Sequence, residues 1–156
     1  MTVYAPIDCE KVRNLIGEVQ FNMEKLRDIA GEGRESFVNN HDNYARGEHY
    51  FRRALEGILT IGTHILSRLP KTKTKDYQTI ITSLADYKVI PHAFAEKNKK
   101  LAAYRNRLVH LYWEVSSGEL FTTIEKHLED IDAFCAYFVE YIRERERLSG
   151  EEVTTD

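Results

Sequence analysis

Apolar residues recur every three or four positions along most of this chain, the spacing that places them on one face of an α-helix. The first apolar stripe predicts a helix over residues 8–30, with Asp8 as its N-cap and Gly31 as its stop. A wider stripe from Tyr50 to Leu69 predicts a second, central helix. The segment between the two stripes, "GEGRESFVNNHDNY", is predicted to be a linker with one short turn.

The second half of the chain predicts three further helices. A short one is expected around residues 77–87, and Pro91 opens a fourth, where the first turn tolerates its missing N–H. Ser116 and Glu119 have the spacing of a capping box, which predicts the start of a fifth helix whose apolar stripe runs from Leu120 to Ile142. No segment alternates apolar and polar residues for long enough to predict a strand. The predicted fold class is all-α, an up-down helical bundle of four long helices plus a short helix.

Length and composition fit one domain. The 156 residues are 42% hydrophobic and 30% charged, and we assign residues 1–148 to a single domain and residues 149–156 to a flexible acidic tail. The 25 acidic residues outnumber the 22 basic ones, so any site for a polyanion must be local. No apolar run is long enough for a membrane span, and the N-terminal residues lack the pattern of a signal peptide. We therefore expect a soluble, cytoplasmic protein that does not bind membranes.

Cysteines and histidines indicate no metal centre. Cys9 and Cys135 match no metal or redox spacing and are expected to be reduced thiols. The six histidines form no recognisable set of metal ligands, and His64, within the central stripe, is expected to be structural. The basic segment "PKTKTKD" is interpreted as a solvated connector, with an RNA-backbone contact as the alternative. The cations around the fourth helix are interpreted as a solvated face, with guidance of a polyanion into the motif as the alternative; they are Lys97, Lys99, Lys100 and Arg107.

The stretch "YRNRLVHLYWEV", residues 104–115, concentrates polar chemistry in a helix. At 100° per residue, Asn106 and His110 share one face, whereas Tyr104, Leu108 and Leu111 form the predicted buried stripe. The polar residues offer a guanidinium for phosphate, a group that titrates near neutral pH, an amide and a phenol. This set suits phosphodiester cleavage. The alternative is structural, because cations at a helix C-terminus stabilise its dipole. The four polar residues are Arg105, Asn106, His110 and Tyr112.

Their order matches a known motif: arginine, a four-residue spacer, histidine, one residue and tyrosine. The sequence resembles the HEPN superfamily and, more narrowly, the HepT-like toxins of bacterial and archaeal toxin–antitoxin pairs. The resemblance spans about residues 8–145. "HYFRRALEGILTIGTHIL" is similar to the long second helix of that family, and "YRNRLVHLYWEV" is similar to its signature at the end of the fourth helix.

The resemblance implies the toxin component of a type II/VII-like pair, a metal-independent endoribonuclease without a cofactor. It implies a homodimer whose paired motifs line one cleft, with Arg105 and His110 catalytic and Asn106 supporting them. The implied partner is a minimal nucleotidyltransferase (MNT) antitoxin that adds AMP to Tyr112. Added AMP would bring phosphates into a site that receives phosphates, and so would exclude RNA.

A second interpretation is a non-catalytic HEPN module that binds a nucleotidyltransferase partner or a nucleotide. The presence of both Arg105 and His110 favours the ribonuclease, because a scaffold needs neither residue for chemistry. The net charge of −3 favours the module.

Overall fold

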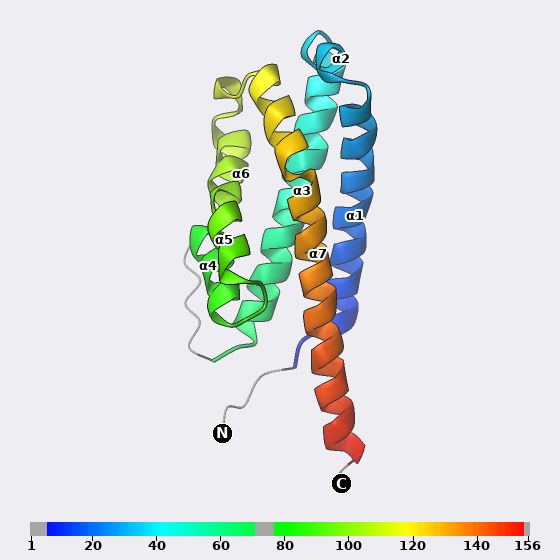
Figure 1. The fold of residues 1–156 in the computed structure, drawn as a ribbon, viewed down its shortest axis with the longest axis vertical. Coiled ribbons are helices and arrows are strands. Elements are labelled where there is room, and N and C mark those ends of the chain that lie inside the picture. Colours follow the sequence, from blue (N-terminus) through cyan, green and yellow to red (C-terminus); the bar gives the residue numbers. More distant parts are fainter. Residues whose placement is uncertain (1–5, 71–76, 155–156) are drawn as a thin grey trace.

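The computed structural model describes residues 6–70 and 77–154. Within these ranges the chain is helical, contains no strand and packs as a bundle (Figure 1). The prediction of an all-α bundle is confirmed. In chain order the elements are α1 (Cys9–Gly31), α2 (Arg34–Val38), α3 (His41–Ser67), α4 (Tyr77–Asp86), α5 (His92–Asn98), α6 (Lys100–His110), the 3-10 turn η1 (Tyr112–Glu114) and α7 (Ser117–Thr154).

Helix α3 is the centre of the bundle. It packs against α1 on one side and against α4 and α6 on the other, and it also contacts α7. Helices α1 and α7 pack against each other as well, so the α1–α7 seam and the α3–α6 seam lie on different sides of the bundle (Figure 1). Helix α6 thus has α3 as its main support.

Side chains cap the helices where the sequence places suitable residues. Asp8 Oδ1 accepts from the Lys11 N–H at 3.0 Å, and Ser116 Oγ accepts from the Glu119 N–H at 3.1 Å. Each satisfies a backbone donor that has no partner within the first turn of a helix. The predicted N-caps of α1 and α7 are confirmed.

Glycine lets α1 approach α3 closely. A Cβ added at Gly57 would lie 2.4 Å from Val19 Cγ2, a distance at which the helices would have to move apart. Gly57 directly follows Glu56, whose side chain projects toward α6. The close packing against α1 therefore helps to fix the position of α3, and Glu56 extends from α3 to Arg105.

The linker prediction for residues 31–44 is wrong in part. The short helix α2 agrees with the one short turn expected there, but α3 already begins at His41, with Asn40 as its N-cap. The apolar stripe does not reveal this start because a polar residue, Asn43, occupies a buried position. Its amide donates to the Ser36 carbonyl at 3.3 Å, which satisfies part of its hydrogen-bonding capacity inside the core.

The predicted fourth helix is two helices, α5 and α6, separated at Lys99. Pro91 is the N-cap of α5 and lies just before its first turn. Next to the break, the buried Asn98 side chain donates to the Phe94 carbonyl at 3.0 Å. This bond competes for the acceptor that a continuous helix reserves for a backbone N–H.

Two further expectations concern the C-terminal tail and the basic loop between α3 and α4. Helix α7 continues to Thr154, so the backbone is helical where a tail was expected to begin, and the domain boundary at residue 148 stays a prediction. The lysines of the basic loop, residues 71–75, lie outside the described residues.

Both cysteines are free thiols, and the buried His64 accepts from the Asp8 N–H at Nε2, at 3.1 Å. None of the helices in the described ranges has the length and apolar character needed to cross a bilayer.

Candidate functional site

The four predicted residues lie where α6 ends and the chain turns into α7 (Figure 1). Arg105, Asn106 and His110 belong to the last two turns of α6, and Tyr112 begins η1. Helix α6 ends because Leu111 leaves helical geometry, with φ −136° and ψ 36°. The prediction that Leu111 belongs to the buried stripe is wrong, since its side chain is exposed at this turn.

Arg105 is the most enclosed of the four, with 16% of its side chain exposed. Its Nη2 donates to Glu56 Oε1 at 3.3 Å and its Nη1 donates to Asn106 Oδ1 at 3.1 Å. Two acceptors in different directions orient the planar guanidinium. The structure thus places Asn106 in hydrogen-bond contact with Arg105, and its supporting role stays a prediction. The structure also adds Glu56, which the sequence analysis missed.

Glu56 also contacts a second arginine. The same Oε1 accepts from Arg52 Nη1 at 3.4 Å, one helical turn earlier on α3. Glu56 is 49 positions from Arg105 in sequence, so no local spacing could connect the two. The only signal available was that Arg52 and Glu56 have the i, i+4 spacing of an ion pair.

His110 presents its imidazole to solvent, on the same helix face as the exposed Asn106. In the described part of the chain, no hydrogen bond joins His110 to Arg105, Asn106 or Tyr112. Asn106 therefore accepts a hydrogen bond from Arg105 and lies on the same helix face as His110.

Tyr112 projects from η1 with 54% of its surface exposed, next to Trp113, which is 68% exposed. The two rings meet edge to face with centroids 5.5 Å apart. The turn beneath them is held by Tyr44 of α3, whose hydroxyl donates to the Val115 carbonyl at 2.8 Å and contacts the Tyr112 carbonyl at 3.4 Å. Burial, with the carboxylates of Glu48 and Glu119, raises the pKa of Tyr44, which keeps this hydroxyl a donor.

An ion pair fastens the same end of α6 to α7. Arg107 donates to Glu119 from both terminal guanidinium nitrogens, from Nη1 to Oε1 at 2.7 Å and from Nη2 to Oε2 at 3.2 Å. Glu119 is therefore directed to Arg107, so only the Ser116 half of the predicted capping box is present among the described hydrogen bonds. Lys97 similarly pairs with the buried Asp130 at 3.1 Å. Arg107 and Lys97 thus pair with carboxylates, and this pairing reduces their attraction for a polyanion.

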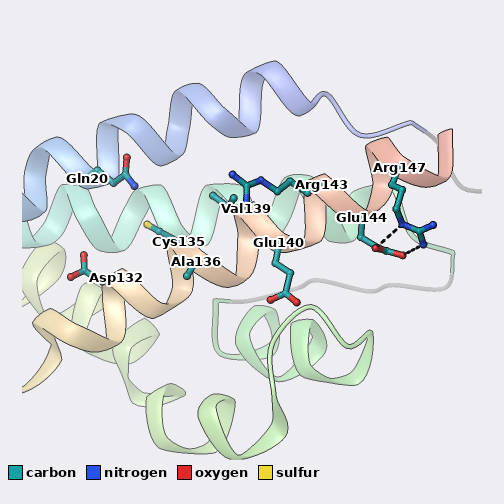
Figure 2. A pocket seen from close by; sticks show the side chains of 9 residues that line it. All are labelled: Gln20, Asp132, Cys135, Ala136, Val139, Glu140, Arg143, Glu144 and Arg147. Atoms are coloured by element: carbon teal, nitrogen blue, oxygen red, sulfur yellow. Dashed lines mark hydrogen bonds and ion pairs between the residues drawn. The ribbon is translucent and has the colours of Figure 1, made fainter. Parts of the chain in front are cut away.

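Three of the four predicted site residues, Asn106, His110 and Tyr112, are exposed. A hollow of about 710 Å³ lies instead along α7 beside α1 and contains none of the four predicted residues (Figure 2). Side chains of both charges line it, and Glu144 and Arg147 pair with each other there. No group of three or more histidine, cysteine or acidic side chains within the described ranges is arranged to hold a metal ion. The exposed histidine beside an oriented arginine is accessible to a polymer from solvent.

A sequence model of the family described as "Ribonuclease HepT-like" matches residues 19–138, which include Glu56, Arg105, Asn106, His110 and Tyr112. The chain belongs to this family. The resemblance inferred from the motif is therefore confirmed. The family match does not by itself assign a role to any one residue, so the roles given above to the four site residues stay predictions.

Named relatives agree with this membership. The tRNA nuclease HepT of Aphanizomenon flos-aquae is 22% identical over 142 residues, which cover 91% of this chain and 95% of that protein. The cytosolic protein of unknown function YutE from Bacillus subtilis has a similar structure, with a TM-score of 0.77, 23% identity, and coverage of 93% of this chain and 95% of that one.

A toxin–antitoxin complex contains the same fold. The tri-AMPylated Shewanella oneidensis HEPN toxin, solved with its MNT antitoxin, matches with a TM-score of 0.71 and 21% identity. The match covers 83% of this chain and 96% of that toxin. At these identities the structural likeness shows a shared fold, and the activity of this chain must be argued from its own residues.

Proposed function

We propose that this chain is the toxin of a type II/VII-like toxin–antitoxin pair and acts as a metal-independent endoribonuclease. The observation that carries the proposal is the Arg105 guanidinium, which Glu56 and Asn106 orient beside the face that presents His110. Membership of the HepT-like ribonuclease family, and similarity to a protein named as a tRNA nuclease, support RNA as the substrate.

In the proposed reaction the RNA supplies its own nucleophile. The 2′-hydroxyl oxygen attacks the adjacent phosphorus, and the bond from phosphorus to the 5′ oxygen breaks. A neutral His110 accepts the hydroxyl proton, and the protonated imidazole returns a proton to the leaving oxygen. Arg105 stabilises the negative charge that develops on the phosphoryl oxygens, and Asn106 holds its guanidinium in place.

Tyr112 is a regulatory residue in this proposal. Its exposed ring is accessible to a nucleotidyltransferase, whose reaction would join the phenol oxygen to the α-phosphorus of ATP, release pyrophosphate and remove the phenol proton. The attached AMP would place a phosphate near Arg105 and exclude RNA. The AMPylated toxin in the solved Shewanella complex supports this assignment.

We also propose that the active form is a homodimer in which two copies of the motif face one cleft. His110, Asn106 and Tyr112 are exposed, so one copy offers little enclosure for a strand of RNA. A two-fold axis beside the site would frame the strand with two identical sets of groups. Light scattering at micromolar concentration should give the mass of two chains.

The second candidate is the non-catalytic module that binds a nucleotidyltransferase or a nucleotide. The ion pairs of Arg107 and Lys97 favour it, because each sets a cation near α6 against a carboxylate and reduces the local attraction for RNA. Catalysis by His110 distinguishes the two candidates.

The test is cleavage of total RNA by the purified chain, with and without EDTA. We expect cleavage to persist in EDTA and the His110→Ala variant to be slower by about 10²-fold or more, because acid–base catalysis is lost. His92→Ala is the matched control, an exposed histidine at the start of α5. Activity abolished by EDTA and restored by Mg²⁺ would refute the side-chain mechanism. Cleavage by His110→Ala at the rate of His92→Ala would refute the catalytic role of His110, provided the circular dichroism spectra of both variants match the wild type. Absence of cleavage by the wild type would favour the module.

A further inference from the structure

Glu56 has two arginine partners on one oxygen. Its Oε1 accepts from Arg52 at 3.4 Å and from Arg105 at 3.3 Å, so the two guanidinium groups are neighbours across the α3–α6 seam. One carboxylate facing two guanidiniums leaves this trio with a net charge of +1. By contrast, Arg107 pairs with Glu119 and Arg27 pairs with Asp132, and each of these ion pairs has a net charge of zero.

The two arginines of the trio are held differently. Arg105 has 16% of its side chain exposed and a second acceptor in Asn106, whereas Arg52 and Glu56 are each 33% exposed. An i, i+4 ion pair with this exposure is weak, because solvent screens it and both side chains lose freedom in forming it. Arg52 can therefore exchange Glu56 for a phosphate at little cost, while Arg105 keeps its orientation.

We infer that Arg52 is a second phosphate-binding residue of the site and holds the RNA backbone beside the phosphate that Arg105 serves. This inference rests on the proposed ribonuclease function. A guanidinium donates two parallel hydrogen bonds to phosphate, and these charge-assisted bonds are stronger than its contact with a half-solvated carboxylate.

The assignment separates binding from chemistry. Arg52 lies on α3, one turn from Glu56, and acts on the substrate backbone, whereas Arg105 lies on the motif helix and acts on the reacting phosphate. Loss of Arg52 should therefore raise the KM for RNA more than it lowers kcat. Loss of Arg105 should chiefly lower kcat.

The decisive measurement is the salt dependence of RNA binding. End-labelled bulk tRNA is titrated with the full chain carrying His110→Ala, which slows cleavage enough for binding to be measured first. Binding is followed by fluorescence anisotropy across a series of salt concentrations. Each phosphate contact contributes about 0.7 (single strand) to 0.9 (duplex) to the slope of log affinity against log salt. Adding Arg52→Gln should reduce the slope by about this amount.

Arg27→Gln is the matched control. It removes one guanidinium and one ion pair, with Asp132, at the α1–α7 seam on another side of the bundle, where Figure 2 shows Asp132. Its slope should equal that of the parent. Arg52→Lys should keep the slope but bind more weakly, because it keeps the charge and loses the two parallel hydrogen bonds.

The outcomes separate this inference from the proposed function. If the wild type cleaves RNA and the slope is unchanged by Arg52→Gln, the role of Arg52 is refuted and the ribonuclease stands. If the wild type neither binds nor cleaves RNA, both are refuted. If Arg52→Gln does not fold, Arg52→Lys decides, since an affinity equal to that of the parent would overturn the assignment.

Discussion

Replacing Glu56 by glutamine should move turnover and RNA affinity in opposite directions. The substitution keeps the shape of the side chain and an acceptor oxygen, but it removes the charge that faces Arg52 and Arg105. Arg105 loses a charge-assisted hydrogen bond, so its guanidinium is held less firmly. At the same time the site becomes more positive by one charge. We therefore expect slower chemistry and tighter binding of RNA.

The fall in turnover follows from the strength of the hydrogen bond that is weakened. A charge-assisted bond is roughly twice as strong as a neutral one, which corresponds to a net loss of about 1 kcal/mol. If the transition state needs the orientation that Glu56 gives to Arg105, kcat should fall about fivefold. Glu56→Ala leaves no acceptor and should lower kcat further.

The gain in affinity follows from the removed repulsion between Glu56 and the RNA. A phosphate on the far side of the guanidinium would lie about 7 Å from the carboxylate, a repulsion of about 0.6 kcal/mol in water and about 2.4 kcal/mol at an effective dielectric constant of 20. Glu56 is 33% exposed, so the lower part of this range applies. The affinity should rise about threefold to tenfold at low salt, and less at high salt.

Single-turnover cleavage with excess protein measures the chemical step, and anisotropy in the His110→Ala background measures affinity. Asp132→Asn is the matched control, because it removes one carboxylate from an arginine pair at the α1–α7 seam. It should leave the rate of the chemical step unchanged. An unchanged rate for Glu56→Gln would refute the orienting role of Glu56, and weaker RNA binding would refute the electrostatic argument.

Two further predictions concern the regulatory tyrosine and pH. Co-expression with an MNT antitoxin should add whole AMP units to Tyr112 and abolish cleavage. It should also change the fluorescence emission of Trp113, the only tryptophan, because the centroid of its ring lies 5.5 Å from that of Tyr112. The same added mass on the Tyr112→Phe variant would contradict this prediction. Burial lowers the pKa of His64, and its Nε2 accepts from the Asp8 N–H only when neutral. The unfolded chain therefore binds a proton first as the pH falls through about 6.5, so the free energy of unfolding should decrease from about pH 7 to about pH 5. Urea unfolding should show that the free energy of unfolding of His64→Gln decreases less than that of the wild type over this pH range. An equal decrease in both proteins would exclude His64 as the source of the pH dependence.

Much of the fold could be predicted from the sequence because helices are local. The 3.6-residue period of apolar positions and two N-caps, Asp8 and Ser116, act within a few residues of the backbone that they organise. The candidate motif could be found for the same reason, since Arg105 and His110 lie within one helix. The predictions failed where polar side chains act locally against the pattern: the buried Asn43 hides the start of α3, and Asn98 lies beside the break between α5 and α6.

By itself, then, the sequence determined an all-α chain of amphipathic helices and the set of polar groups at the end of one of them. The tertiary structure alone decided how those groups are oriented. Glu56 reaches Arg105 from 49 positions away, and Tyr44 holds the Tyr112 turn from 68 positions away. Neither contact has a sequence period, because each depends on α3 packing against the end of α6 and the turn that follows, and that packing is set by the core as a whole. Helix periodicity indicates which face of a helix is buried. Only the assembled bundle determines which side chains of other helices contact that face.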